Sequence, residues 1–147
     1  MMKRILALSL VLAFLFSGTA LAAVNWQLAY QEGDQSFYFN PNTVRNDGSI
    51  DVICADLKTE MTADRLAELI AKYKDAYDVV NWSQISYSVS FTTYNRTAGT
   101  LNTKNHRFYD ANNKLIARIP DEAECRLNKT SSVNKIYAAI IAWQYEE

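Results

Sequence analysis

His106 is the only histidine among 147 residues, and histidine is the one ordinary side chain that gains or loses a proton near neutral pH. It lies in a polar segment between Asn105 and Arg107, and no serine occupies the Gly-x-Ser-x-Gly turn that presents the nucleophile in many hydrolases. A lone histidine in such a segment is more often a surface or hairpin residue than a general base. The sequence therefore predicts no catalytic residue and a protein that is not an enzyme.

The other side chains that could bind a metal or a cofactor form no recognisable site. Glu32 and Asp34 lie in a turn, where acidic residues serve turn geometry and solubility. Asp110, Asn112 and Asn113 resemble the start of a calcium loop, but the required glycine and final glutamate are missing. One histidine and two cysteines without Cys-x-x-Cys spacing do not make an ordinary zinc site. Because no glycine-rich phosphate loop is present either, we expect neither a metal nor a cofactor.

The N-terminal segment has the pattern of a secretory signal. Two basic residues precede an apolar run over 5–16, and the small residues Ala20 and Ala22 mark a cleavage site. We therefore predict a signal peptide over 1–22 and a single domain over 23–147. The apolar run is shorter than the about 20 residues of a membrane-spanning helix. We expect an exported protein in the periplasm, on the cell surface or secreted, with no membrane span in its mature part.

The charge balance argues against a nucleic-acid partner. The predicted signal holds two of the 15 basic residues and none of the 16 acidic residues, so the mature part carries more acid than base. A protein that binds a phosphate backbone needs a basic patch or stripe. The sequence offers none, so we expect no nucleic acid.

Cys54 and Cys125 are the only cysteines. In an oxidising compartment outside the cytoplasm, a single pair most simply forms a disulfide. The bridge would close a loop of about 70 residues and stabilise the fold by about 4 kcal/mol in the chain-entropy model. The alternative is two free buried thiols. We predict a Cys54–Cys125 disulfide.

Hydrophobic periodicity predicts an α+β domain with a mainly antiparallel sheet of about six strands and two amphipathic helices. One helix follows the third strand and the other is C-terminal. The expected strands are 25–30, 36–40, 49–57, 85–92, 100–109 and 114–119, and the expected helices are 62–78 and the segment that begins at Ser131 or Ser132.

The strand that begins at Ile85 has the clearest pattern. Ile85, Tyr87, Val89 and Phe91 alternate with small polar residues, as in a strand with one face toward the core and one toward water. We expect the apolar set to point inward and at least one helix to pack on that inward face.

Aromatic and basic residues gather around the next loop and hairpin. Tyrosine and arginine are enriched at protein interfaces. The candidate contact surface consists of Tyr94, Arg96, His106, Arg107 and Tyr109.

Several segments together resemble the surface-adhesin protein E-like family of exported bacterial domains. They are Trp26, the SFYFNPNTVR segment at 36–45 with the turn at 46–48, the strand at 50–53, YSVSF at 87–91, Arg96-Thr97, Phe108-Tyr109-Asp110 and NNKLI at 112–116. The resemblance implies an antiparallel sheet flanked by helices. It also implies binding to host extracellular-matrix glycoproteins and homodimer formation.

These observations favour a non-enzymatic exported binding domain, adhesin-like in character, that contacts a protein or glycoprotein outside the cytoplasm. One alternative is an inhibitor of an extracellular hydrolase such as lysozyme, with the loop at 95–99 entering the active-site cleft. Another is a small periplasmic ligand carrier or hydrolase, which would need a deep pocket near His106.

Overall fold

Eight antiparallel strands form one sheet in the computed structural model, which describes residues 24–146. Its main path runs β1-β2-β4-β5-β6-β7, while β3 pairs with β4 and β8 pairs with β6. The strands are β1 (Gln27–Glu32), β2 (Gln35–Phe39), β3 (Arg45–Asn46), β4 (Val52–Glu60), β5 (Ile85–Asn95), β6 (Thr100–Asp110), β7 (Leu115–Ile119) and β8 (Glu122–Arg126). The predicted α+β class is confirmed, although the sheet has eight strands and not six. The predicted signal peptide lies outside the described residues.

The two strands that were not predicted, β3 and β8, have no apolar face from which a strand could be inferred. β3 has only two residues, and all five residues of β8 are exposed. The sequence of β8, EAECR, has no apolar run that would predict a strand. Both are short strands that pair with one end of a long neighbour, β3 with β4 and β8 with β6.

Two helices complete the fold, α2 (Ala63–Tyr73) and α3 (Ser132–Glu146), with short 3-10 turns η1 (Pro41–Thr43) and η2 (Trp82–Gln84). Thr62 caps the start of α2, because its Oγ1 accepts a hydrogen bond of 3.3 Å from the Arg65 backbone N–H. α2 ends earlier than the predicted position 78. No helix within residues 24–146 has the length and apolar character needed to cross a membrane.

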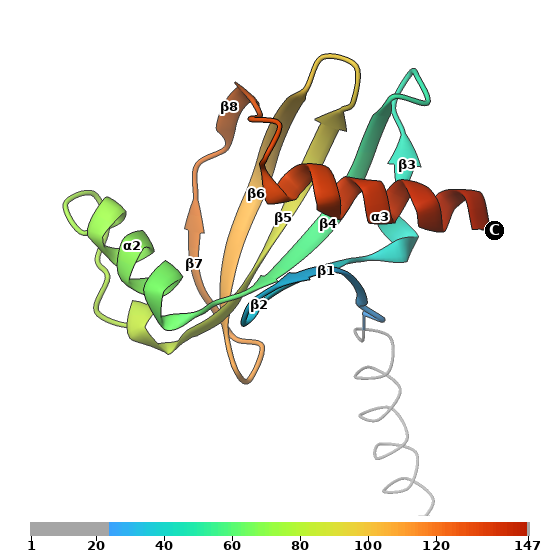
Figure 1. Ribbon diagram of the computed structural model, residues 1–147. Helices are drawn as coiled ribbons and strands as arrows, with labels where there is room; N and C mark the ends of the chain where they lie inside the picture. The colour runs from blue at the N-terminus through green and yellow to red at the C-terminus, as the bar shows by residue number, and fades with distance from the viewer. Residues whose placement is uncertain (1–23, 147) are drawn as a thin grey trace, which may run out of the picture.

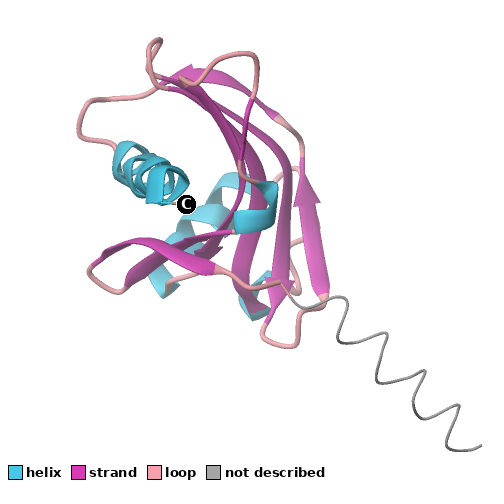
Figure 2. Ribbon diagram, turned by 90° about the vertical axis from the view of Figure 1, so that its right-hand side faces the viewer, coloured by secondary structure: helices cyan, strands magenta, loops and turns pink. Residues whose placement is uncertain are grey.

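Both helices lie on the concave side of the curled sheet (Figures 1 and 2). Ile136, Tyr137 and Ile140 on α3 are fully buried in one cluster with Ile53 and Ala55 of β4. The apolar face of α3 is therefore the one that its periodicity predicted. Packing this face against the sheet forms the larger of the two hydrophobic clusters of the domain.

A second, smaller cluster lies under α2. Its buried members are Trp82, Ile85, Phe108 and Ile119. The apolar face of α2 packs against them, and each of its residues is only partly buried: Leu66, Leu69, Ile70, Tyr73 and, beyond the helix end, Tyr77. α2 thus covers the part of the concave face that α3 does not reach.

The predicted orientation of β5 is wrong over most of its length. Ser88 and Thr92 are buried on the concave face, with 5% and 3% of their surface exposed. Tyr87, Val89 and Phe91 point to the convex face, where neither of the helices within residues 24–146 packs. The small residues are needed inside because helix α3 approaches the sheet there: the Tyr137 hydroxyl on α3 is hydrogen-bonded to Thr92.

Ile85 follows the prediction and faces the concave side. A bulge between Ile85 and Tyr87 adds one residue to β5 relative to β6, which reverses the alternation at that point. A second bulge, between Val89 and Phe91, adds a residue to β6 at Asn105, whose φ of 52° is left-handed. These bulges bend the sheet around the helices.

The predicted disulfide is also wrong: Cys54 is a free buried thiol and Cys125 a free exposed one. Cys54 pairs with Thr93, Thr93 with Asn102, and Cys125 with Leu101, so three strand-to-strand steps separate the cysteines. At about 4.8 Å a step their backbones are about 14 Å apart, whereas a disulfide needs Cα atoms within about 7 Å. The side chains also lie on opposite faces of the sheet.

Candidate functional site

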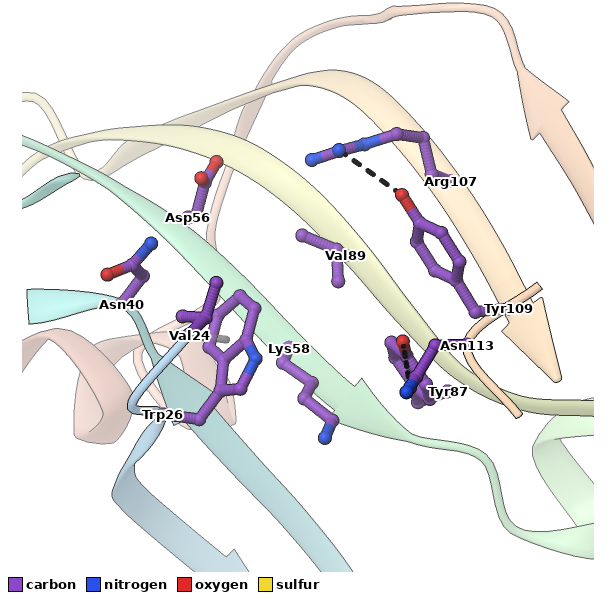
Figure 3. A pocket seen from close by; sticks show the side chains of 10 residues that line it. All are labelled: Val24, Trp26, Asn40, Asp56, Lys58, Tyr87, Val89, Arg107, Tyr109 and Asn113. Carbon is purple, nitrogen blue, oxygen red and sulfur yellow. Dashed lines mark hydrogen bonds between the residues drawn. The ribbon is translucent and has the colours of Figure 1, made fainter. Parts of the chain in front are cut away.

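The convex face of the sheet carries a cleft of about 710 Å³ (Figure 3). Main-chain groups of β4, β5 and β6 pair with one another along the strands, so only side chains can recognise a ligand there. The cleft is lined by Val24, Trp26, Asn40, Asp56, Lys58, Tyr87, Val89, Arg107, Tyr109 and Asn113.

Val89 forms the floor of the cleft and is 5% exposed. The sheet register places a cation on each side of it, since Val89 is directly opposite Lys58 on β4 and Arg107 on β6. Directly opposed residues project their side chains from the same face of a sheet. The two cations therefore flank one apolar floor.

Lys58 lies among aromatic rings. Its Nζ is 4.5 Å from the ring centre of Tyr87, 5.8 Å from that of Tyr38 and 6.0 Å from that of Trp26. A cation at these distances over a ring face is attracted by the ring quadrupole. The rings thus hold the lysine stem in place while its charge borders the cleft.

Tyr87 and Tyr109 form a stacked pair across β5 and β6, with ring centres 5.1 Å apart and an angle of 15° between the rings. The Tyr87 hydroxyl donates a hydrogen bond of 2.9 Å to Asn113 Oδ1. Asn113 lies in the β6–β7 turn with a φ of 65°. In the same turn the Asp110 carboxylate accepts bonds from the main chain, so this segment is a hairpin turn, as predicted.

Arg107 is oriented by two contacts. Its Nε donates to the Asn105 carbonyl over 3.2 Å, and its Nη1 donates to the Tyr109 hydroxyl over 3.3 Å. The first contact depends on the bulge at Asn105, which turns that residue's backbone toward the arginine. Figure 3 shows the guanidinium extending over the cleft. Its Nη2 makes no bond within the described residues, so it is available to a ligand.

Asp56 is half-buried at the edge of the same cleft. Burial raises the pKa of its carboxyl group, while the nearby charges of Arg107 and Arg45 act in the opposite direction. Within residues 24–146, no hydrogen bond or ion pair reaches this carboxylate. Its oxygens can therefore accept hydrogen bonds from a ligand.

The residues of the predicted contact surface are divided among four places. Arg107 and Tyr109 line the convex cleft. Tyr94 is 6% exposed in the α3 core, where its ring stacks on Tyr137 with centres 4.6 Å apart. Arg96 is exposed at one end of the sheet.

His106 lies on the concave side and stacks on Phe108, with ring centres 4.6 Å apart. Its Nδ1 is buried and has no hydrogen-bond partner. Burial lowers the pKa of the imidazole, Glu122 raises it, and the charges of Arg65 and Lys72 lower it further. No contact orients this histidine toward a nucleophile, and the convex cleft does not include it.

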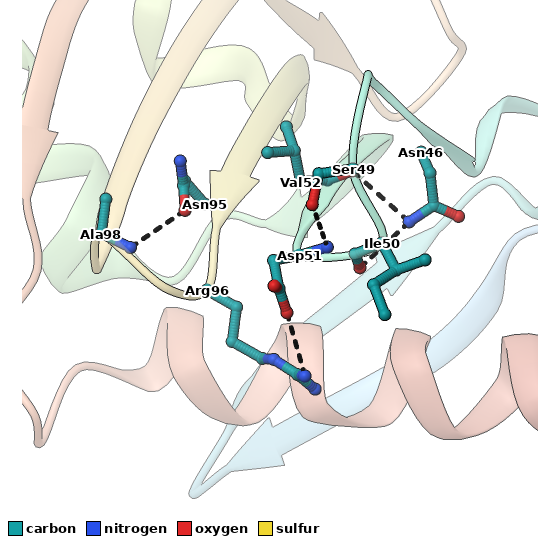
Figure 4. A network of polar contacts seen from close by, with 8 residues as sticks. All are labelled: Asn46, Ser49, Ile50, Asp51, Val52, Asn95, Arg96 and Ala98. Carbon is teal, nitrogen blue, oxygen red and sulfur yellow. Dashed lines mark hydrogen bonds and ion pairs between the residues drawn. The ribbon is translucent and has the colours of Figure 1, made fainter.

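A polar cluster at the Arg96 end joins two loops (Figure 4). The Arg96 guanidinium pairs with the Asp51 carboxylate at 3.0 Å, and the Arg96 backbone N–H donates to the Asp51 carbonyl at 2.8 Å. Asn95 Oδ1 accepts a bond of 2.9 Å from the Ala98 N–H. The β5–β6 loop is therefore held against the β3–β4 hairpin.

Sequence reasoning missed the cleft residues on β4 and at the N-terminal end of the described chain. Asp56 and Lys58 interrupt the otherwise apolar β4 at alternate positions, which is a signal that this face of the strand differs from the core face. Trp26 contributes to the family resemblance, but its position beside Lys58 of β4 could not be predicted from the sequence. That position depends on how the chain enters β1. Within residues 24–146, no group of three acidic, histidine or cysteine side chains could hold a metal ion.

No family model matches the chain, and no curated protein sequence matches it. Three solved structures of Haemophilus influenzae protein E are similar to it. Crystal form II has a TM-score of 0.48 and 14% identity over 76% of this chain and 83% of the solved chain. Another structure has a TM-score of 0.49 and 13% identity over 74% and 78%.

The crystal structure of protein E from non-typeable Haemophilus influenzae has a TM-score of 0.51 and 11% identity, over 85% of this chain and 82% of the solved chain. At this identity the similarity shows the fold alone. The chain has a protein E-like fold, and any shared activity has to be argued from its own residues.

Proposed function

We propose that the chain is an exported, non-enzymatic binding domain whose convex sheet face contacts a protein or glycoprotein outside the cytoplasm. The observation that supports this most strongly is the cleft around Val89, with Lys58 and Arg107 on either side and a stacked tyrosine pair at its edge. Tryptophan, tyrosine and arginine are the residue types that dominate binding energy at interfaces.

The cleft is organised before any partner arrives. Arg107 is fixed by Asn105 and Tyr109, and Lys58 is held among aromatic rings. Fixing these long side chains in advance reduces the entropy lost on binding. Such an arrangement suits recognition, whereas no group in the cleft is arranged as a nucleophile with a base.

The sequence resemblance to the surface-adhesin protein E-like family makes host extracellular-matrix glycoproteins the first class of partner to test. The predicted signal peptide supports a location in the periplasm, on the cell surface or outside the cell. Homodimer formation, which the resemblance also implies, would raise the avidity of such a surface.

The test is capture of matrix glycoproteins and envelope extracts by the immobilised domain, comparing the unaltered chain with Arg107→Gln. The matched control is Arg96→Gln, which removes an exposed arginine far from the cleft. We expect Arg107→Gln to weaken capture by roughly tenfold or more, because truncating one partner of a buried charge pair commonly costs that much. Arg96→Gln should leave capture unchanged. Capture that is equally insensitive to both variants, or no capture at all, would contradict the proposal.

Inhibition of an extracellular hydrolase is a second candidate, favoured by the stiff β5–β6 loop. The Arg96–Asp51 pair and the Asn95–Ala98 bond preorganise this exposed loop for insertion into a cleft. A panel of lysozymes assayed with the domain tests this candidate. Inhibition that Asp51→Asn weakens would support it, and activity unchanged by the domain would exclude it for that panel.

A further inference from the structure

We infer that the convex cleft binds a carboxylated saccharide chain, with the sugar carboxylate placed above Val89 between Lys58 and Arg107. This inference rests on the proposed function and narrows it, because it makes the glycan part of a partner the recognised group. It follows from the charge, the hydrogen-bond capacity and the shape of the cleft.

The position of the anion follows from the strand register. Lys58 and Arg107 are each directly opposite Val89, so their backbones lie about 10 Å apart across the floor, at about 5 Å a strand. No acidic side chain among the described residues pairs with either cation. A carboxylate above Val89 would accept from the free Nη2 of Arg107, whose planar fork matches carboxylate geometry.

The neighbouring groups suit sugar hydroxyls. The Asp56 carboxylate is an unused acceptor, and the Asn40 side chain uses its Oδ1 on the Asn42 N–H but keeps its Nδ2 donor. Buried polar groups in a ligand site need partners when the ligand displaces water. A chain rich in hydroxyl groups supplies donors to Asp56, which a polyphosphate chain does not, and a densely sulfated saccharide has fewer free hydroxyl groups to offer.

The shape of the cleft suits a ring. Trp26 stands on one side of the cleft and Tyr109 on the other (Figure 3). The C–H face of a pyranose is flat and apolar, so it can pack against such rings while the ring substituents reach the polar groups. An extended peptide is a poorer match, since the main-chain groups of β4, β5 and β6 are already paired and cannot extend a sheet.

The charges around the cleft also favour a saccharide of low charge density. Two cations border the cleft, but Asp56 lies beside them, so densely sulfated chains would meet a like charge. A chain with one carboxylate on alternate sugars fits better. Two sources share this chemistry: uronic acid-containing glycans of the extracellular matrix, and the muramic acid-containing glycan of bacterial cell walls.

The test measures affinity by calorimetry for four probes of similar length. A hyaluronan hexasaccharide and an oligosaccharide of alternating N-acetylglucosamine and N-acetylmuramic acid carry spaced carboxylates. Chitohexaose is an uncharged control of similar length. A heparin hexasaccharide is the control with a high density of negative charge. We expect at least one carboxylated probe to bind roughly tenfold more tightly than chitohexaose and heparin, and preference between the two carboxylated probes identifies the source.

Variants connect binding to the cleft. Arg107→Gln and Lys58→Gln should each weaken binding of the preferred probe by roughly tenfold. Lys104→Gln is the matched control, because Lys104 lies on the same face of β6, opposite Phe91 and beyond the cleft. Urea midpoints confirm that each variant is folded.

Equal or tighter binding of chitohexaose or heparin, no binding of either carboxylated probe, or insensitivity to both cleft variants would overturn the inference. The saccharide inference can fail without contradicting the proposed function. If glycoprotein capture depends on Arg107 while no carboxylated saccharide binds, the proposed binding face stands and the saccharide inference fails.

Discussion

The ammonium group of Lys58 lies 4.5 Å from the centre of the Tyr87 ring, on the face of the sheet opposite helices α2 and α3. Tyr87 in turn stacks on Tyr109. A cation and two aromatic rings from three adjacent strands therefore form one continuous row. Contacts of this kind hold the three side chains in fixed positions on the convex face, which is why the orientation of β5 matters for the proposed function.

Ser88→Phe tests that orientation. Ser88 is buried on the concave face, so a phenylalanine there overpacks the core, and we expect the free energy of unfolding to fall by about 1–3 kcal/mol. The matched change is Phe91→Ser on the convex face, where the loss should be smaller because the ring is half-exposed. Urea denaturation measures both. A larger loss for Phe91→Ser than for Ser88→Phe would show that the faces are the other way round.

Tyr137→Phe tests how α3 is attached to the sheet. The Tyr137 hydroxyl is fully buried and hydrogen-bonded to Thr92, and burial raises its pKa well above the ordinary value. Removing the hydroxyl should lower the free energy of unfolding by about 1–2 kcal/mol, because the Thr92 groups lose a buried partner. Tyr145→Phe is the control, since Tyr145 is 74% exposed. Equal urea midpoints for the two variants would contradict the contact.

His106 should make the stability depend on pH. Burial lowers its pKa in the folded chain below the ordinary 6.5, so the unfolded chain binds a proton more readily. Stability is therefore greatest above pH 6.5 and is lost as the pH falls toward the folded pKa. We expect His106→Gln to lose less stability than the unaltered chain between pH 7.5 and 5.5, measured by urea denaturation. Parallel losses in the two proteins would show that the imidazole is not desolvated.

Thiol chemistry tests the absence of the disulfide. Cys125 is exposed and Cys54 is 1% exposed, so a thiol reagent should modify Cys125 in the folded domain and Cys54 only after unfolding. Mass spectrometry of the purified, unreduced domain gives the number and position of the labels. A Cys54–Cys125 cross-link in that sample would contradict the register that separates them.

The helices and turns could be predicted from the sequence because their signals are local. The apolar stripe of α3 has a period that places Ile136, Tyr137 and Ile140 on one face, and that face is the buried one. The turn at 46–48 and the hairpin around Asp110 use residues that accept unusual backbone angles. Each of these signals lies within a few residues of the structure that it specifies.

The faces of β5 could not be assigned in this way. Alternation shows that a strand has two different faces, but it does not show which one a helix covers. The answer depends on β4, where Ile53, Ala55 and Leu57 pack on the core side. β5 follows in register, which places Ser88 inside. Small residues at the helix contact and aromatic residues outside reverse the usual pattern, and a functional face is one setting where such a reversal is expected.

The cleft itself required the structure, because its residues come from distant parts of the chain. Trp26, Lys58 and Arg107 become neighbours only through the sheet order and the bulge at Asn105. Of the predicted contact residues, Arg107 and Tyr109 are in the cleft. Their residue types predicted these two as contact residues. The same reasoning also predicted Tyr94, although the ring of Tyr94 is part of the core.

Side-chain NMR spectra of the domain with and without its captured partner will show whether the convex face is the binding surface. We expect shifts in the Val89 methyl signals and the Tyr87 and Tyr109 ring signals, with the Ile136 methyl and Tyr94 ring signals on the concave side unchanged. Shifts confined to the concave side, or to the loop around Arg96, would show that the partner binds elsewhere and not on the convex face.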